Sequence, residues 1–323
     1  MTFDAKPYLK ELARGEHGSR DLTREQARTV FAAVFAGELS DLALGALLVA
    51  LRVKGESLDE LAGMMDALAG HVRPMRLPAR RAIPVVIPTY NGARKLPNLV
   101  PLLALLLARE NIPVLVHGAA QEASRVGTLP ILELLGHPPR ATIADAEESI
   151  DEHHLAAVSV GVLSPDLERL IDARMEIGVR NSGHTLAKLM LPTGIAPAAA
   201  CRLIAVTHPA FLKMLREYFL QAPANAFLMR GVEGEAVVRL HQAQPIEEMK
   251  ADGASVSHLI TDSDKDYALP ARDAGTTAQW TRDVLEGKIA APMALARQVA
   301  LIVEHCRHAA SSGRQPLKLV SSK

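Results

Sequence analysis

The sequence has 323 residues, of which 49% are hydrophobic, 22% charged and 3% aromatic. This composition excludes an intrinsically disordered chain, and the length suits one or two domains. The formal net charge of +0 gives no overall preference for anionic or cationic partners. Two cysteines, Cys201 and Cys306, favour a reducing compartment over a disulfide framework. The apolar runs are too short to cross a bilayer, and residues 1–16 are charged throughout. We therefore expect a cytoplasmic protein without a membrane partner.

The first 72 residues predict helices. Thr23 is followed three residues later by Gln26, and Ser57 by Glu60, which is the spacing of a capping box at the start of a helix. Between these two starts, a mostly apolar stretch over 42–53 predicts a further helix. We therefore expect a small amino-terminal helical domain over residues 1–72.

A stiff, basic linker follows the helices at residues 73–82, which hold four arginines and two prolines. The apolar run 85–87 then suits a buried parallel strand, 96–108 suits a helix, and 114–116 suits a second strand. A strand, a helix and a strand joined by short loops form a βαβ unit, so we expect the strands to be parallel. Both loops then lie at the carboxyl edge of the sheet, where open α/β sheets bind ligands.

The rest of the chain continues the α/β pattern. A helix ends at Leu135 before Gly136, the acidic run 145–152 is interpreted as a solvated face, and the stretch 166–177 is amphipathic. Further strands are predicted at 203–206 and 226–229, and further helices at 210–220, 277–286 and 292–310. We expect a larger α/β domain over 73–323 with a mainly parallel sheet, and helices near 165–190 that pack on the helical domain.

Charge is segregated along the chain. Residues 81–140 hold six Lys/Arg and three Asp/Glu (+3), 141–170 hold one and seven (−6), and 171–230 hold seven and three (+4). The basic excess therefore falls in the segments that are predicted to line the ligand edge of the sheet, which favours an anionic ligand there.

Several motifs share the frame of one known family. The loop 88–92 (Pro-Thr-Tyr-Asn-Gly) stands where that family has Gly-Thr-Gly-Gly-Asp, and 116–119 (Val-His-Gly-Ala) where it has Lys-His-Gly-Asn. The run 174–192 keeps the family's two arginines, a glycine and a proline, and 22–56 resembles its amino-terminal helices. The chain thus resembles the anthranilate phosphoribosyltransferases over about residues 8–310.

The resemblance implies a helical domain joined to an α/β domain and a homodimer formed through the amino-terminal helices, with Phe31, Phe35 and the 42–51 face as the expected interface. It also implies a substrate site, but the polar groups of that site are largely replaced: Tyr90 and Asn91 stand where the family has two glycines. We therefore expect no catalytic residue, no metal ligand and no cofactor. The expected vestigial phosphoribosyl pyrophosphate site consists of Thr89, Tyr90, Asn91, Gly92, Asn98, His117, Gly118 and Ser124.

The loop 88–92, the run 181–188 and the Arg-Gly-x-Glu-Gly-Glu stretch at 230–235 resemble in particular the YbiB-type branch of this family, whose members are regarded as nucleic-acid binders. This resemblance implies binding of DNA or RNA in a basic cleft, largely without sequence specificity, and low aromatic content argues against base stacking as the main mode. The expected nucleic-acid-binding residues are Arg94, Lys95, Arg125, Arg174, Arg180, Lys188 and Arg230.

Two enzymatic alternatives stay open. One is an active anthranilate phosphoribosyltransferase that uses phosphoribosyl pyrophosphate with Mg²⁺, and the other is a related transferase acting on another nitrogen base. The retained Arg174 and Arg180 keep the transferase for another nitrogen base open, and the resemblance implies that the arginine at the position of Arg174 contacts the anthranilate carboxylate. A third interpretation is that the arginines only form surface ion pairs, for example with the acidic run 145–152.

Overall fold

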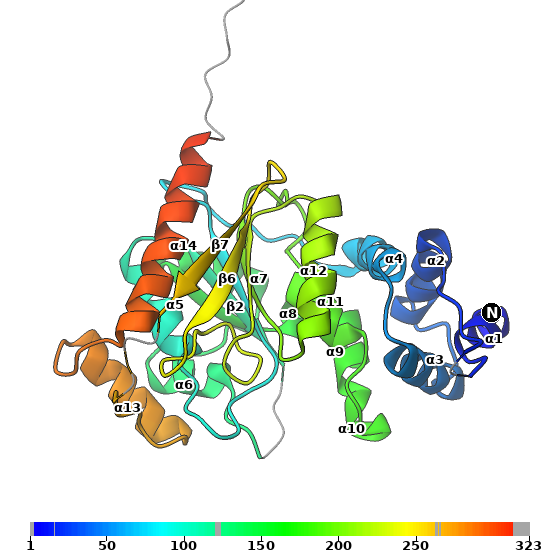
Figure 1. Cartoon of the computed structure of the whole chain (residues 1–323), viewed down its shortest axis with the longest axis horizontal. Helices are drawn as coiled ribbons and strands as arrows, with labels where there is room; N and C mark the ends of the chain where they lie inside the picture. Colours follow the sequence, from blue (N-terminus) through cyan, green and yellow to red (C-terminus); the bar gives the residue numbers. More distant parts are fainter. Residues whose placement is uncertain (1–2, 16, 120–123, 262–263, 265, 313–323) are drawn as a thin grey trace, which may run out of the picture.

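The computed structural model describes residues 3–15, 17–119, 124–261, 264 and 266–312, and confirms a small helical domain followed by a larger α/β domain. Figure 1 shows the helical domain at one end of the molecule. The side chains of Thr23, Ser40 and Ser57 accept the N–H groups three residues on, and both predicted capping boxes are present. The helical domain consists of α1 (Lys6–Leu12), α2 (Arg24–Phe35), α3 (Asp41–Lys54), α4 (Leu58–Leu68) and η1 (Ala69–His71).

The interior of the helical domain uses residues that we had assigned to a dimer interface. Phe31 and Phe35 are 0% and 1% exposed, and Leu47, Leu48 and Leu51 are also buried within the chain. The expectation that these side chains form an intersubunit face is therefore wrong. Their helical periodicity reflects packing inside one domain, which sequence alone does not distinguish from packing between subunits.

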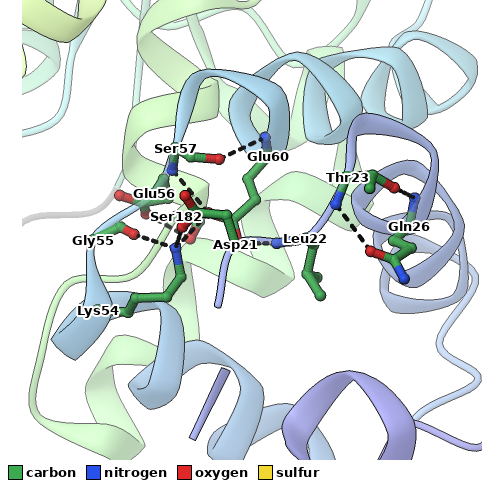
Figure 2. A network of polar contacts seen from close by, with 10 residues as sticks. All are labelled: Asp21, Leu22, Thr23, Gln26, Lys54, Gly55, Glu56, Ser57, Glu60 and Ser182. Atoms are coloured by element: carbon green, nitrogen blue, oxygen red, sulfur yellow. Dashed lines mark hydrogen bonds and ion pairs between the residues drawn. The ribbon is translucent and has the colours of Figure 1, made fainter. Parts of the chain in front are cut away.

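A buried carboxylate holds three segments of the helical domain together (Figure 2). Glu60, which is fully buried, accepts hydrogen bonds from the backbone N–H groups of Leu22 (2.9 Å) and Ser57 (2.8 Å). The Lys54 ammonium donates to the same carboxylate at 2.7 Å and also contacts Asp21. The Glu60 carboxylate therefore joins the starts of α2 and α4 to the end of α3, and two backbone N–H groups and one ammonium group compensate its charge.

The α/β domain is built on one sheet with the strand order β3-β2-β1-β4-β5-β6-β7. The first five strands are parallel, as predicted, whereas β6 and β7 form an antiparallel hairpin that the sequence analysis did not predict. The strand order reverses at β1, whose neighbours are β2 and β4. The strands are β1 (Val85–Thr89), β2 (Val114–Gly118), β3 (Leu155–Ser159), β4 (Cys201–Ala205), β5 (Ala226–Met229), β6 (Gln244–Met249) and β7 (Ser255–Ile260).

Helices cover both faces of the sheet. Val86 and Leu115 belong to a core that continues into the helical domain, whereas Val85 and Ile87 face a second core beneath α5 and α14. In Figure 1, α9, α11 and α12 lie between the sheet and the helical domain, and they contact α2 or α4. The helices of this domain are α5 (Val100–Arg109), α6 (Thr128–Leu134), α7 (Ile143–His153), α8 (Val160–Leu163), α9 (Pro165–Asp172), α10 (Arg174–Ile177), α11 (Gly183–Leu189), α12 (Pro209–Gln221), α13 (Ala274–Leu285) and α14 (Met293–Ser312).

The acidic run forms α7, and its carboxylates contact the linker that follows the helical domain. Arg76 and Arg80 form ion pairs with Asp151, and Glu147 accepts the backbone N–H of Arg76 at 2.6 Å. The acidic run thus neutralises arginines of the linker. The exact domain boundary at residue 72 stays a prediction. In the described part of the chain, no helix is long and apolar enough to span a membrane.

Candidate nucleic-acid interface

The candidate site is a pocket of about 570 Å³ beyond the carboxyl ends of β1 and β4. Open α/β sheets bind ligands in such a crevice, at the point where the strand order reverses. Loops after both strands reach the pocket, and α11, the start of α12 and the end of α3 supply the remaining walls. Its polar lining consists of Arg52, Glu56, Asn91, Arg180, Asn181, His184, Thr185, Lys188, Thr207 and His208.

Tyr90 is turned away from this pocket into the protein interior. It is 3% exposed, and its hydroxyl is hydrogen-bonded to Nδ1 of the fully buried His117. Burial lowers the pKa of His117 to about 3, so this imidazole is neutral at pH 7, and burial also raises the pKa of the Tyr90 phenol. The sequence analysis placed Tyr90 in the vestigial substrate site, at a position where the family has a glycine. The structure corrects this, because the ring is inaccessible.

Other residues of the expected vestigial site are engaged in hydrogen bonds within the protein. The hydroxyls of Thr89 and Thr128 are 2.6 Å apart, and the Asn98 side-chain amide donates to Thr128 at 3.0 Å. A Cβ atom on Gly118 would lie 2.6 Å from the Thr89 carbonyl oxygen, so this close approach of β1 and β2 requires glycine. Ser124 is exposed. The buried members of this group therefore act as structural polar contacts.

Asn91 connects the two sides of the site. Its side-chain amide donates to the Gly234 carbonyl at 2.6 Å, while its side-chain oxygen accepts a hydrogen bond from Arg180. The Arg125 guanidinium donates to the Asn91 carbonyl at 3.1 Å. Two of the predicted basic residues, which are 55 positions apart in the sequence, thus meet at one loop residue.

The same loop is bonded to two glutamates. Glu235 Oε1 accepts the N–H groups of Asn91 and Gly92 at 2.8 and 2.7 Å, and Glu233 accepts those of Arg94 and Lys95 at 2.5 and 2.9 Å. The side chains of Arg94 and Lys95 extend to the exposed rim. Lys95, Glu233 and Glu235 also line a second pocket of about 530 Å³.

The α11 wall carries closely spaced basic groups. The Lys188 ammonium donates to the carbonyls of Ala205 and Gly234. Burial lowers its pKa to about 8, with Arg180 acting in the same direction and Glu235 opposing. Burial, followed by the nearby positive charges of Arg180 and Arg174, lowers the pKa of His184 to about 3. Both shifts are those of basic groups that are partly desolvated beside other positive charges.

Of the seven predicted basic residues, Arg180 and Lys188 line the cleft, and the other five are not among its lining residues: Arg94, Lys95, Arg125, Arg174 and Arg230. Arg174 is 8% exposed, and its Nη1 lies 3.5 Å from Nε2 of His184. Arg230 is exposed beyond the end of β5. Conversely, the sequence analysis missed Arg52, which the end of α3 brings to the pocket, and Arg272, which donates to the Arg94 carbonyl. No local pattern marks these two, because only the tertiary fold brings them to the site.

The implied Mg²⁺ and phosphoribosyl pyrophosphate do not fit this arrangement. A diphosphate needs free backbone N–H groups, and Mg²⁺ needs free carboxylate oxygens. Here the loop amides donate to Glu233 and to Oε1 of Glu235, so they are not free for a diphosphate. Oε2 of Glu235 is a single buried oxygen without a hydrogen-bond partner among the described residues, which is fewer than the several oxygen ligands that Mg²⁺ needs. No chemical step through these ligands follows from the observed geometry.

Comparisons with known proteins agree with the fold. A model of the "Glycosyl transferase family, helical bundle domain" matches residues 6–72. The uncharacterized protein YbiB of Escherichia coli (strain K12) is 40% identical over 299 residues, which is 92% of this chain and 93% of YbiB. The anthranilate phosphoribosyltransferase of Desulfosudis oleivorans is 30% identical over 84% of this chain and 81% of its own length.

A crystal structure of anthranilate phosphoribosyltransferase from Thermus thermophilus has a TM-score of 0.73 and 26% sequence identity, over 94% of this chain and 89% of that chain. The relatives and this structure share both the helical domain and the α/β domain. The chain therefore belongs to the anthranilate phosphoribosyltransferase-like family.

Proposed function

We propose that this protein binds DNA or RNA in the cleft beyond β1 and β4, largely without sequence specificity, and does not transfer phosphoribosyl groups. The observation that carries the proposal is the charge of the pocket. Arg52, Arg180 and Lys188 line it, and among its described lining residues Glu56 is the one acidic side chain. Basic groups held at such density attract the phosphates of a nucleic-acid backbone.

The expected binding mode follows from the chemistry of the cleft. Guanidinium and ammonium groups contact phosphates, which position a nucleic acid without reading its bases. Tyr90 is buried and offers no ring for stacking, which leaves Phe211 as the one phenyl ring among the described residues that line the cleft. Affinity is therefore expected to depend strongly on salt and weakly on sequence.

The test is fluorescence anisotropy of a labelled random-sequence oligonucleotide, titrated at several salt concentrations. The triple variant Arg94→Ala, Lys95→Ala and Arg180→Ala should weaken binding to every sequence similarly. Its log–log salt slope should shrink by about one to three units, at about 0.7–0.9 for each phosphate that is no longer neutralised.

A matched control removes the same charge away from the cleft: Arg28→Ala, Arg76→Ala and Arg80→Ala take out three arginines that form ion pairs with Glu25 or Asp151. This control should bind as the wild type does. Absence of binding at low salt, or equal weakening in both triple variants, would contradict the proposal.

Membership of an enzyme family supports the second candidate, an active anthranilate phosphoribosyltransferase. Incubation with anthranilate, phosphoribosyl pyrophosphate and Mg²⁺, followed by loss of anthranilate fluorescence, tests it directly. Turnover of roughly 0.1 per second or more, against a typical ~10 per second, would replace our proposal. A thermal shift with phosphoribosyl pyrophosphate but no anthranilate turnover would favour a transferase for another nitrogen base.

We further propose a homodimer formed through the amino-terminal helices. Because Phe31 and Phe35 are internal, the proposed contact moves to the outer face of α3. There Leu42 and Val53 are 85% and 82% exposed, with Val49 between them at 40%. Covering these side chains would remove apolar surface from water.

A further inference from the structure

We propose that Glu233 and Glu235 act as built-in anion mimics. Their carboxylates occupy the backbone N–H groups of the loop 91–95 and exclude small phosphate-containing anions such as diphosphate. In this role the two residues determine specificity, because the loop amides are closed while the basic side chains around them can still attract a longer polyanion. The inference rests on the loop contacts and does not require that the protein binds nucleic acid.

All five backbone N–H groups of the loop have a partner. Those of Asn91 and Gly92 donate to Glu235, and those of Arg94 and Lys95 donate to Glu233. The remaining N–H, of Ala93, donates to the Val126 carbonyl at 2.8 Å. Consecutive N–H groups that converge in a loop form an anion-binding concavity. In this protein two glutamates fill it.

The turn that carries the glutamates has an unusual backbone. Glu233 has φ +53°, a conformation that residues with a side chain rarely adopt, and Gly234 follows with φ +88°. A Cβ atom on Gly234 would lie 2.6 Å from the Asn91 side-chain nitrogen, so glycine is required there. Hydrogen bonds from Asn91 and Lys188 to the Gly234 carbonyl hold this turn against the loop. Two consecutive left-handed residues thereby direct both carboxylates toward the amides.

Electrostatics favours the internal carboxylate over a small external anion. Glu235 is 3% exposed, and the positive charge of Lys188 lies close enough to be influenced by it. A buried carboxylate is costly unless hydrogen bonds and opposite charges compensate it. The loop amides compensate Oε1 of Glu235, whereas its Oε2 is buried without a hydrogen-bond partner among the described residues. An incoming diphosphate would have to displace two negative groups and leave them unsatisfied, which opposes binding.

The hydrogen-bonded contact between the two glutamates and the loop 91–95 also separates two pockets. Asn91 lines the cleft of about 570 Å³, whereas Glu233 and Glu235 line the neighbouring pocket of about 530 Å³. Removal of the carboxylates would expose the amides to this neighbouring space, which is large enough to admit a small anion. The basic residues Lys95 and Lys188 would then face an anion site with no internal competitor.

The experiment measures binding of inorganic diphosphate by isothermal titration calorimetry without divalent metal. The test protein carries Glu233→Gly, which suits the positive φ, together with Glu235→Ala. We expect its affinity for diphosphate to exceed that of the wild type by at least about tenfold, since several charge-assisted hydrogen bonds become possible.

A matched control separates this effect from a change in net charge. Glu110→Ala with Glu247→Ala removes two carboxylates that form ion pairs with Arg307 and Arg216 outside the loop. If the folded test protein binds diphosphate no more tightly than this control, the proposal is overturned. If the double variant does not fold, Glu233→Gly alone decides the question, and an unchanged affinity overturns the proposal equally.

Oligonucleotide anisotropy on the wild type, run in parallel, keeps the two proposals apart. Failure of the wild type to bind an oligonucleotide would remove the proposed function, and the diphosphate result would stand. Gain of diphosphate affinity in the test protein, with the control unchanged, supports the role of the glutamates in either case.

Discussion

Replacement of Glu60 by alanine should strongly destabilise the helical domain. The carboxylate is 0% exposed and accepts from Leu22 N, Ser57 N and the Lys54 ammonium (Figure 2). Alanine removes all three acceptor contacts at once. Two backbone N–H groups then lose their partners, one at the start of α2 and one at the start of α4.

The size of the stability loss depends on which hydrogen-bond partners each donor retains in the Glu60→Ala protein. Loss of one partner of a buried ion pair costs about 3–5 kcal/mol. Lys54 keeps Asp21 at 2.5 Å and the Gly55 carbonyl at 2.7 Å, so its charge is not stranded. The low end therefore applies to the ion pair, and the orphaned N–H groups add about 1–3 kcal/mol each where water cannot reach them. At the low end of both ranges, about 3 kcal/mol for the ion pair and about 1 kcal/mol for each of the two N–H groups, we expect a total loss of about 5 kcal/mol in the free energy of unfolding.

Urea denaturation followed by far-UV circular dichroism measures this loss. Glu25→Ala is the matched control, because Glu25 pairs with Arg28 on an exposed helix face, where solvent screens the ion pair and its loss should change stability little. Glu60→Gln, which keeps the shape and part of the acceptor capacity, should fall between the two. A Glu60→Ala protein within about 1 kcal/mol of the Glu25→Ala control would refute the argument.

Two other expectations concern pH and assembly. The fold lowers the pKa of His184 from 6.5 to about 3. Between these two pH values the unfolded chain therefore binds more protons than the folded chain does, so the stability of the fold should decrease as the pH drops from 6.5 toward 3. His184→Gln should reduce the loss between pH 7 and pH 4.5, measured by urea denaturation, by about 2 kcal/mol, and an unchanged loss would contradict the assignment. Light scattering at micromolar protein should give twice the chain mass for the wild type and a monomer for Leu42→Glu with Val53→Glu; a monomeric wild type would remove the dimer.

The parallel part of the sheet could be predicted from the sequence, but the hairpin could not. β1, β2 and β5 are short apolar runs bounded by turn residues, and this pattern suffices for buried parallel strands. In β6 the buried positions include Gln244 and Glu248, so alternation of apolar and polar residues is absent. Glu248 is satisfied by His258 and His305, at 2.6 and 2.7 Å. A strand that buries polar groups against distant partners has no local signature.

The candidate site shows the same limit. The sequence pointed to the loop after β1 and to basic residues such as Arg180 and Lys188, because their motifs resemble those of a known family. It contained no sign that Tyr90 turns inward to His117, since burial at a strand end depends on which partner the next strand offers. Nor did it show that Glu235 bonds to an amide 144 residues away. Such contacts arise only when separate loops meet at one edge of the sheet.

A chain with zero net charge can still present a basic cleft, because attraction of a polyanion depends on the local arrangement of charge. At physiological ionic strength the screening length is about 8 Å, so distant acids do not cancel the cations of a site. Of the acids of α7, Asp151 is paired with Arg76 and Arg80 of the linker. In the cleft, the lowered pKa values of Lys188 and His184 reflect partly desolvated basic groups beside other positive charges. Neutral overall charge therefore weakens long-range attraction of a polyanion without removing the local positive charge of the cleft.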